Sequence, residues 1–424
     1  MLNRRLLCRG LENKSSLLKK LVARSLCAIT NPDRNNIGEQ ISETQIAERL
    51  RAKSITPEEL QCAFFDMAHT MSFRAVTHIL HTAATNNMSI ASSDVAKINQ
   101  CIANTNFCSN RSASRLLNSI RAFKEQDEHT DEFVKNIADG MLVNNMPRLS
   151  SIEMGASMFG IGHLKRRSAH YFAIVAVLAS KIHQTNAPYR SNDLFQAMCA
   201  VRNMSTDSPE ERNLLDALAT QIDKCNESFS PKQLAMAVSA LPSLNPRHAD
   251  SYFEALCSKI LTCEEKFNKI ELCTILYGMR NLHKNHDFPR RVLPHVVDHL
   301  KDGGPLKSVQ VARGFYGLKR LPSSFPAVGT VISIFNKDLL SLASMDTYLS
   351  CMVLNGLQKQ RESDDVLETI SCIAKHLQDK KDINCHHLSM CYYGLQTVGV
   401  VEIPVRNLLS YAANKAEVTC VAGN

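Results

Sequence analysis

Tryptophan is absent from the 424-residue chain, and aromatic residues make up only 6% of it. Strands of β-sandwiches are rich in aromatic and β-branched residues. Short patterns of Leu, Ile, Val and Ala dominate here instead, so the composition favours packed helices over sheets. No apolar run approaches the roughly 18–20 residues that a bilayer-spanning helix needs, and we expect no membrane insertion.

Enzyme and metal motifs are also missing. The chain has no Walker A loop, no His-Glu-x-x-His and no Gly-x-Ser-x-Gly sequence, so we expect a protein that is not an enzyme and needs no cofactor. The densest group of possible metal ligands is CHHLSMC, residues 385–391. Zinc sites usually combine two paired halves, and the sequence offers only this one. Cys391 shares an apolar helical pattern with Leu388 and Met390, so we predict a buried thiol and no metal site.

The net charge of +8 is concentrated at the start of the chain. Residues 1–34 hold eight basic and two acidic residues, which leaves 41 basic and 39 acidic residues, a net charge of +2, for the remainder. This segment mixes Leu with Arg, Lys and Ser and has no continuous apolar core, which is typical of a mitochondrial presequence, here residues 1–35. An ordinary basic surface helix is the alternative. Fifteen scattered cysteines fit a reducing compartment, so we expect the mitochondrial matrix.

One pattern recurs along most of the chain. LYGMRNL, residues 276–282, reappears as FYGLKRL, residues 315–321, with a glycine at the same point. Six more copies have a small residue in this register, which we number position zero. Successive small residues are 38 to 41 residues apart, which predicts a structural repeat. The eight residues at position zero are Ser119, Gly160, Ala200, Ala240, Gly278, Gly317, Gly356 and Gly394.

Apolar residues surround position zero at offsets −6, +1 and +4, which share one face of a helix. The exception at +4 is Gln360. Position −9 has a residue type that is a good helix N-cap in five copies, and we interpret it as the N-cap. These predicted caps are Asn110, Ser151, Ser191, Ser308 and Thr347, and in two other copies Ser230 and Asn384 lie one residue earlier.

A second apolar helical segment follows each copy, so the unit is a helical hairpin. Glycine in a helix interior costs about 1 kcal/mol relative to alanine. We expect the missing side chain to let a neighbouring helix approach closely, so that packing contacts offset this cost. Such hairpins cannot bury their apolar face alone and stack into a solenoid. The predicted fold is an all-α, right-handed solenoid of about eight hairpins of 38–41 residues.

Four parts of the chain follow from this interpretation. Residues 1–35 are the presequence, and residues 36–105 are a degenerate helical cap with helices predicted at 72–86 and 90–103. Residues 106–412 are the solenoid, with a last helix predicted at 405–418. Residues 413–424 are a tail.

The helix pattern resembles the octotricopeptide repeat class, which is related in architecture to the pentatricopeptide repeat proteins. Three copies carry it: Leu272–Gly278–Met279–Leu282, Val311–Gly317–Leu318–Leu321 and Leu388–Gly394–Leu395–Val398. The resemblance implies a solenoid that acts on organellar RNA in maturation, stability, editing or translation. Many members end in a RAP domain with a nuclease-like fold. Only 26 residues follow Val398, so we do not expect that domain or its cleavage activity.

Positions +2 and +3 are polar in most copies, and stacking would align them in a ladder. Arg and Lys neutralise phosphates, and Asn reads base edges of single-stranded RNA. The helix macrodipole, which favours cations at helix C-termini, explains the same row without a ligand. The candidate RNA-binding residues of the ladder are Arg121, Arg202, Asn203, Arg280, Asn281, Lys319, Arg320 and Lys359.

A second basic stretch is HLKRRSAHYF, residues 163–172. Lys165, Arg166 and Arg167 could hold an RNA backbone while Tyr171 stacks on a base. A solvated loop between helices is the alternative.

Two functions of different classes fit these features. The first is a non-catalytic mitochondrial protein that binds single-stranded RNA along the ladder. The second is a scaffold subunit of a mitochondrial RNA-processing, editing or ribosomal assembly, which the net charge of +2 outside the leader favours. A general adaptor of the armadillo or HEAT type is a further alternative.

Overall fold

A computed structural model describes residues 73–103, 109–143, 148–282, 286–301, 303–378, 380 and 382–396. All of them belong to Arg49–Asn424, the second of two units into which the chain divides. The predicted presequence, the predicted last helix at 405–418 and the tail lie outside the described residues.

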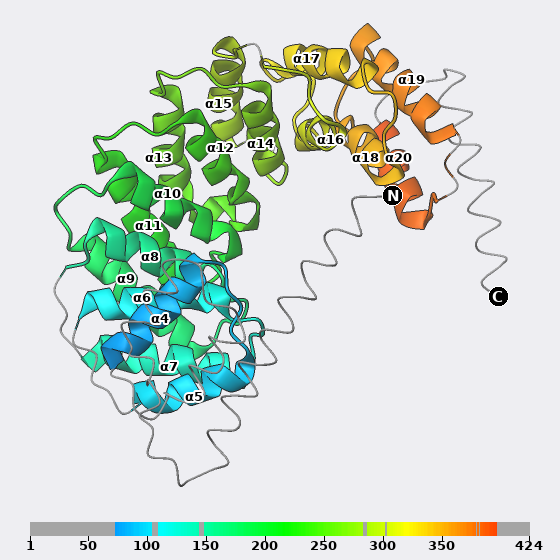
Figure 1. The fold of residues 1–424 in the computed structure, drawn as a ribbon. Coiled ribbons are helices and arrows are strands. Elements are labelled where there is room, and N and C mark those ends of the chain that lie inside the picture. Colours follow the sequence, from blue (N-terminus) through cyan, green and yellow to red (C-terminus); the bar gives the residue numbers. More distant parts are fainter. Residues whose placement is uncertain are drawn as a thin grey trace, which may run out of the picture. The chain divides into compact units, whose positions relative to one another are not determined.

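The described residues form α-helices and short 3-10 turns but no strand, and the helices follow one another in two rows (Figure 1). Each even-numbered helix packs against the next even-numbered one, and the odd-numbered helices pack likewise. The even row comprises α4 (Phe73–Thr85), α6 (Asn110–Ser119), α8 (Ser151–Ile161), α10 (Ser191–Ala200), α12 (Pro231–Ser239), α14 (Lys269–Met279), α16 (Ser308–Gly317), α18 (Thr347–Gly356) and α20 (Cys385–Leu395). The odd row comprises α5 (Ser92–Ala103), α7 (Glu128–Val143), α9 (Ala169–His183), α11 (Pro209–Lys224), α13 (Asp250–Leu261), α15 (Asp287–Asp298), α17 (Val328–Leu340) and α19 (Asp364–Gln378).

The predicted all-α solenoid of helical hairpins is therefore confirmed. The helices predicted at 72–86 and 90–103 are confirmed as α4 and α5, and they continue the two rows. None of the described helices combines the length and the apolar character that crossing a membrane requires.

The apolar positions of the repeat form the core. All eight residues at +1 are buried, and so are all the described ones at +4, from Phe123 to Gln360. Gln360 is fully buried although it is polar, because its amide donates a hydrogen bond to the carbonyl of Leu321 at 2.6 Å. Leu321 holds position +4 of the preceding copy, so the one polar exception at +4 links two copies.

Position zero is the point of closest approach within the even row. The glycines at this position are buried. A Cβ added at Gly160, Gly278, Gly317, Gly356 or Gly394 would lie 2.0–2.3 Å from a backbone carbonyl group of the preceding even-row helix. In all five cases this carbonyl belongs to position −2 of the preceding copy, for example Leu276 beneath Gly317. The predicted reason for the recurrent glycine, close approach of a neighbouring helix, is confirmed.

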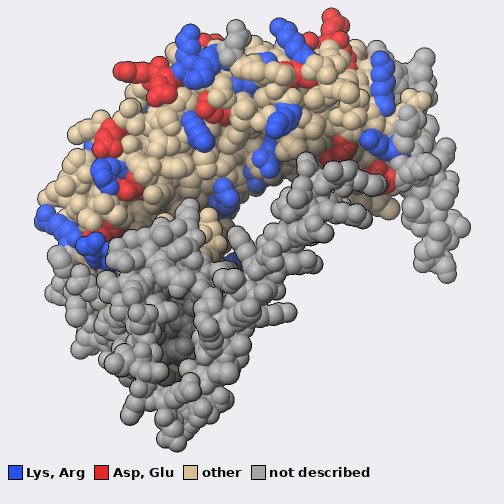
Figure 2. All heavy atoms as spheres, viewed as in Figure 1, with Lys and Arg blue, Asp and Glu red and all other residues tan. Residues whose placement is uncertain are grey.

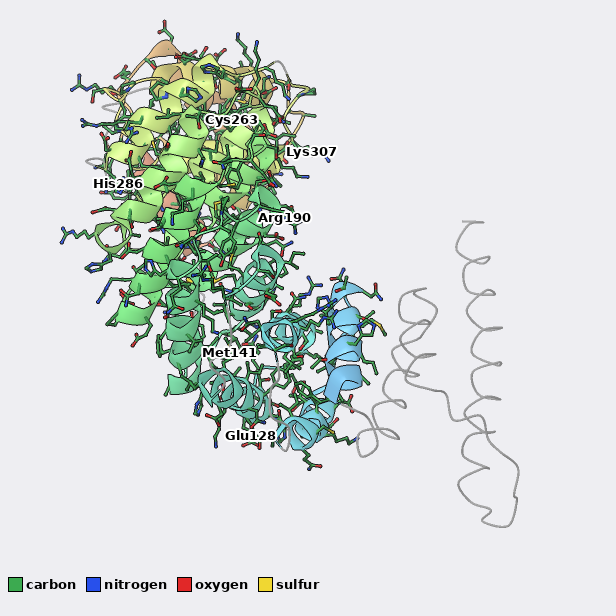
Figure 3. The ribbon with its side chains drawn as sticks, turned by 90° about the vertical axis from the view of Figure 1, so that its left-hand side faces the viewer. Glu128, Met141, Arg190, Cys263, His286 and Lys307 are labelled. Carbon is green, nitrogen blue, oxygen red and sulfur yellow. The ribbon has the colours of Figure 1, made fainter. Side chains whose placement is uncertain are left out.

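The predicted caps Ser230 and Asn384 are confirmed, but in the five copies where the cap was predicted at −9 it lies one residue earlier. Every copy begins its helix after position −10, which is Ser109, Ser150, Arg190, Ser230, Asn268, Lys307, Asp346 or Asn384. Six of these side chains accept a hydrogen bond from a backbone N–H of the first turn. The other two, Arg190 and Lys307, lie on the same edge of the array in Figure 3, opposite His286 at the start of α15.

The predicted caps Asn110, Ser151, Ser191, Ser308 and Thr347 are instead the first residues of their helices. Several of them bond to the following copy or to the loop that leads to it. The hydroxyl of Ser151 donates to the Asp193 carboxylate at 2.7 Å, and the hydroxyl of Ser191 donates to Glu227 at 2.9 Å. Polar residues recur at −9 because they join neighbouring copies.

Replacing the glycine at position zero tests this contact. Gly317→Ala is expected to lower the free energy of unfolding by about 1–3 kcal/mol, because its Cβ would meet the Leu276 carbonyl carbon at 2.3 Å. Urea unfolding followed by circular dichroism measures the change.

Gly329→Ala is the matched control. Gly329 is exposed in the first turn of α17, and a Cβ added there meets nothing within 4 Å. The free energy of unfolding of this variant is expected to stay unchanged or to rise by up to about 1 kcal/mol. Equal destabilisation by the two substitutions would contradict the assigned role of position zero.

Candidate nucleic-acid interface

Positions +2 and +3 lie where the even-row helices end, in several copies within a 3-10 turn such as η2 (Val201–Asn203) or η3 (Leu241–Ser243). Successive copies are in direct contact there. The Asn281 amide donates to the Pro242 carbonyl at 3.0 Å, and the Arg320 guanidinium donates to the Asn281 carbonyl at 3.0 Å. Stacking therefore does bring these positions together into the expected ladder.

The two asparagines of the ladder are already hydrogen-bonded. Asn203 donates its amide to the Gly162 carbonyl, as Asn281 does to that of Pro242. Both accepting carbonyls are at position +2 of the preceding copy, where a helix end leaves carbonyls without intrahelical partners. An RNA base would compete with these bonds, so the asparagines are better suited to joining copies than to reading bases.

A cluster of tyrosines and cations, which includes two residues of the ladder, lies at the C-terminal halves and ends of α14 and α16. We call Tyr277, Arg280, Arg313, Tyr316 and Lys319 the tyrosine cluster. The two rings are 6.2 Å apart at 38°. The guanidinium carbons of Arg280 and Arg313 lie 4.0 and 5.5 Å from the centroid of the Tyr277 ring, and the Lys319 ammonium lies 4.4 Å from that of Tyr316.

The cations of this cluster contact tyrosines and not acids. Besides the ring contacts, Arg280 donates to the Tyr277 carbonyl at 2.6 Å and Lys319 donates to the Tyr316 hydroxyl at 3.1 Å. The described residues contain no salt bridge to Arg280, Arg313 or Lys319. Over much of the face shown in Figure 2, basic and acidic side chains are interspersed. The tyrosine cluster is thus a local site with positive charge and partly exposed aromatic surface.

The tyrosines were missed in the sequence, although a signal was present. Tyr277 and Tyr316 hold position −1, three residues before the cations at +2, and residues three apart lie side by side on a helix. Phe159 and Tyr393 hold the same position in two other copies.

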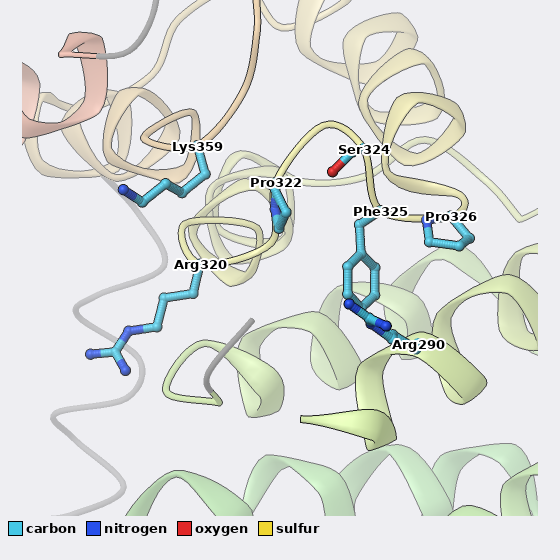
Figure 4. A pocket seen from close by; sticks show the side chains of 7 residues that line it. All are labelled: Arg290, Arg320, Pro322, Ser324, Phe325, Pro326 and Lys359. Atoms are coloured by element: carbon cyan, nitrogen blue, oxygen red, sulfur yellow. The ribbon is translucent and has the colours of Figure 1, made fainter. Parts of the chain in front are cut away.

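A pocket of about 570 Å³ lies where the copies of Gly317 and Gly356 meet. Seven residues line it: Arg290, Arg320, Pro322, Ser324, Phe325, Pro326 and Lys359. Figure 4 shows Arg320 and Lys359 extending in the same direction on one side of Pro322, with Arg290 against the ring of Phe325 on the other side. Arg320 and Lys359 are the +3 residues of successive copies, so this pocket belongs to the ladder.

A smaller pocket of about 270 Å³ lies at the same register near the other end of the array. Arg121 at +2, and Phe159 and His163 of the following copy, contribute to its lining. The Arg121 guanidinium carbon lies 5.4 Å from the Phe159 ring centroid, and its Nε is buried without a hydrogen-bond partner among the described residues. Burial lowers the pKa of Arg121. Burial, Arg115 and Arg121 together lower the pKa of nearby His81 to about 4.

The basic stretch at 165–167 does not form one site. Arg167 donates to the Asn203 carbonyl and to Ser205, and its Nε lies 3.7 Å from the fully buried Glu211. Arg166 pairs with Asp131 at 3.0 Å, whereas Lys165 is exposed.

The predicted stacking role of Tyr171 is wrong. The side chain is buried and donates its hydroxyl hydrogen to Glu211 at 2.9 Å. Burial and the Glu211 carboxylate raise the pKa of Tyr171, so it stays a neutral hydrogen-bond donor.

Arg202 of the ladder, by contrast, is exposed.

The Cys/His stretch near the end of the described chain is part of the packing. Cys391 is buried, as predicted, and its Sγ lies 3.5 Å from that of Cys351 in the preceding copy. All the described cysteines are free thiols. The described part of the chain contains no group of three or more His, Cys, Asp or Glu side chains placed to hold a metal ion.

No protein-family model matches the chain, and no curated protein matches it either. The functional assignment therefore depends on the chemistry of the ladder, the tyrosine cluster and the two pockets.

Arg167 and Lys165 are expected to respond differently to substitution. Arg167→Ala leaves the buried Glu211 without its cation and is expected to cost about 1–3 kcal/mol of stability. Lys165→Ala removes the same charge from an exposed side chain, and its effect is expected to stay within about 0.5 kcal/mol. Thermal unfolding compares the two. A stable Arg167→Ala protein would mean that Arg167 is available for a ligand.

Proposed function

We propose that the chain is a non-catalytic RNA-binding solenoid of the mitochondrial matrix, which binds a single strand along the C-terminal ends of its even-row helices. The tyrosine cluster is the observation that carries this proposal. It combines cations without acidic partners among the described residues with aromatic rings at the same register, which is the combination that single-strand binders use.

In this proposal the side chains have separate roles. Arg280, Lys319 and Arg320 neutralise successive phosphates, while Tyr277 and Tyr316 offer aromatic faces or ring-held guanidinium planes on which bases stack. Five of the eight copies have an Arg or Lys at +2 or +3, and three of these follow one another in the copies of Gly278, Gly317 and Gly356. A strand that follows this part of the ladder meets a cation at each copy. The resemblance to organellar RNA-binding repeats and the basic, leucine-rich leader support the compartment and the ligand class.

A second function, that of a protein-binding scaffold, is favoured by a different surface. Position −8 is apolar and exposed in three consecutive copies, where Ile270, Val309 and Tyr348 are 51%, 42% and 50% exposed. Such a row on one edge suits an apolar protein partner. The two functions use different ends of the even-row helices, so one protein can have both.

Salt-dependent binding tests the RNA proposal. The purified chain should bind a labelled single-stranded RNA in fluorescence anisotropy, with log affinity falling linearly with log salt. Arg280→Ala and Lys319→Ala should each weaken binding and lower the slope by about 0.7. Tyr316→Leu should cost about 1–3 kcal/mol of binding free energy through lost stacking.

Lys337→Ala is the control, because Lys337 is an exposed cation on α17, outside the ladder. It should leave the affinity within about twofold at physiological salt. Absence of binding to any single strand, or equal weakening by Lys337→Ala and Lys319→Ala, would rule the RNA interface out. Partners that survive nuclease digestion and are lost on Val309→Asp would favour the scaffold.

The compartment is tested separately. A fluorescent protein fused to residues 1–35 is expected to enter mitochondria, because this segment carries the basic and apolar residues of a presequence without acidic clusters. Replacing Arg4, Arg5 and Arg9 by glutamate should abolish import. Cytosolic fluorescence of the unmodified fusion would contradict the proposed location.

A further inference from the structure

The larger pocket, which is formed by Arg290 of α15, the segment that follows α16 and Lys359 after α18, has an unusual balance of charge. Arg290, Arg320 and Lys359 line it, and no acidic residue does. All three cations are exposed, and none of them forms a salt bridge with a described residue. Like charges gathered without a counter-ion repel one another, so the pocket is suited to a ligand that carries more than one negative charge.

The two sides of the pocket differ in chemistry. Arg320 and Lys359 extend together on one side (Figure 4), where both charges are available to an anion. On the other side the guanidinium carbon of Arg290 lies 5.6 Å from the centroid of the Phe325 ring. Phe325 is 5% exposed, so the ring serves as a support and the guanidinium is the surface offered to a ligand. A flat cationic surface of this kind stacks on nucleobases.

The loop between these two sides is held in place. Gln360 anchors the α18 end to the Leu321 carbonyl at 2.6 Å, and the Ser323 N–H donates to the Lys359 carbonyl at 3.3 Å. Directly after Pro326, Ala327 takes the left-handed conformation with φ of 65° at the start of α17. A non-glycine residue adopts this conformation only where the surrounding structure imposes it, so the pocket wall between Pro322 and Pro326 is pre-formed.

Size and charge together select the ligand class. A volume of about 570 Å³ falls in the range of small-molecule sites. An internal phosphodiester has a single charge, whereas a phosphomonoester has about −1.5 to −2 at neutral pH. The unneutralised cations Arg320 and Lys359 match the monoester better, and the Phe325 ring covered by Arg290 matches a base.

We propose that this pocket binds a nucleoside phosphomonoester, with the phosphate between Arg320 and Lys359 and the base on the guanidinium of Arg290. The phosphomonoester can belong to a free nucleotide or to the phosphorylated end of an RNA strand. In the second case the inference rests on the proposed RNA-binding function, and it then places a strand end just beyond the C-terminal ends of α16 and α18.

Calorimetric titration of the full-length chain tests the pocket without RNA. Uridine 5′-monophosphate is expected to bind saturably, inorganic phosphate more weakly and uridine not measurably. Arg320→Gln and Lys359→Gln should each weaken nucleotide binding by on the order of tenfold, as the loss of one charge-assisted hydrogen bond requires. Arg290→Gln should remove most of the preference for the nucleotide over inorganic phosphate.

Lys337→Gln is the matched control, since it removes one exposed cation outside the pocket. It should change nucleotide affinity less than twofold. Circular dichroism checks that each variant is folded. Arg320→Gln also loses the hydrogen bond to the Asn281 carbonyl. If this variant is unstable, Lys359→Gln alone tests whether the pocket binds the nucleotide.

Strands that differ only at their ends distinguish the sources of the phosphate. A single-stranded RNA with a 5′-phosphate, one with a 3′-phosphate and one with hydroxyls at both ends are compared by anisotropy. An affinity on the order of tenfold higher for an RNA with one phosphorylated end, with the difference lost in Lys359→Gln, would show that the pocket binds a strand end. Nucleotide binding without this gain supports a free nucleotide.

Different results would refute the pocket assignment and the proposed RNA interface. If the folded chain binds hydroxyl-ended RNA but not uridine monophosphate, and phosphorylated ends bring no gain, the pocket assignment is wrong and the RNA interface stands. If uridine monophosphate binds and no RNA does, the pocket stands and the proposed function fails. Equal displacement of the nucleotide by a hexaglutamate peptide would show a site for polyanions in general and would overturn the nucleotide assignment.

Discussion

Backbone contact at position zero is the constraint on which the rest of the array depends. Where this residue is glycine, the helix lies directly on a carbonyl of the preceding even-row helix, so close that a single added carbon would collide with it. Dense packing of this kind leaves little freedom in the relative position of two helices. Their C-terminal ends are therefore brought together, and the residues at −1, +2 and +3 become a continuous surface.

Much of the scaffold could be predicted from the sequence, because it follows from local periodicity. The repeat length, the buried face at +1 and +4 and the reason for Gly317 all come from spacing alone. Ser230 and Asn384 were correctly predicted as caps, whereas the five caps predicted at −9 were wrong by one residue, although Ser150 with Glu153 shows the capping-box pattern at −10. Polar residues at −9 concealed this capping pattern. They recur because they bond to the next copy, and such bonds cannot be recognised in the pattern of a single helix.

The candidate site was predictable only in part. The cations at +2 and +3 were found, but their surroundings depend on contacts between copies. Thus Asn281 bonds to Pro242 of the preceding copy, and Arg167 pairs with the buried Glu211 some forty residues away. The larger pocket could not be foreseen, because Arg290 reaches it from the odd row while Lys359 comes from the end of α18.

Amide hydrogen exchange on Gly356→Ala tests the central contact most directly. In a stacked array each repeat depends on its neighbours, and exchange reports the stability of each region separately. We expect lost protection on both sides of the contact, in α16 around Phe315 and in α18, while the distant α8 and α10 keep theirs. Loss confined to α18, or protection unchanged throughout, would contradict a backbone contact at position zero.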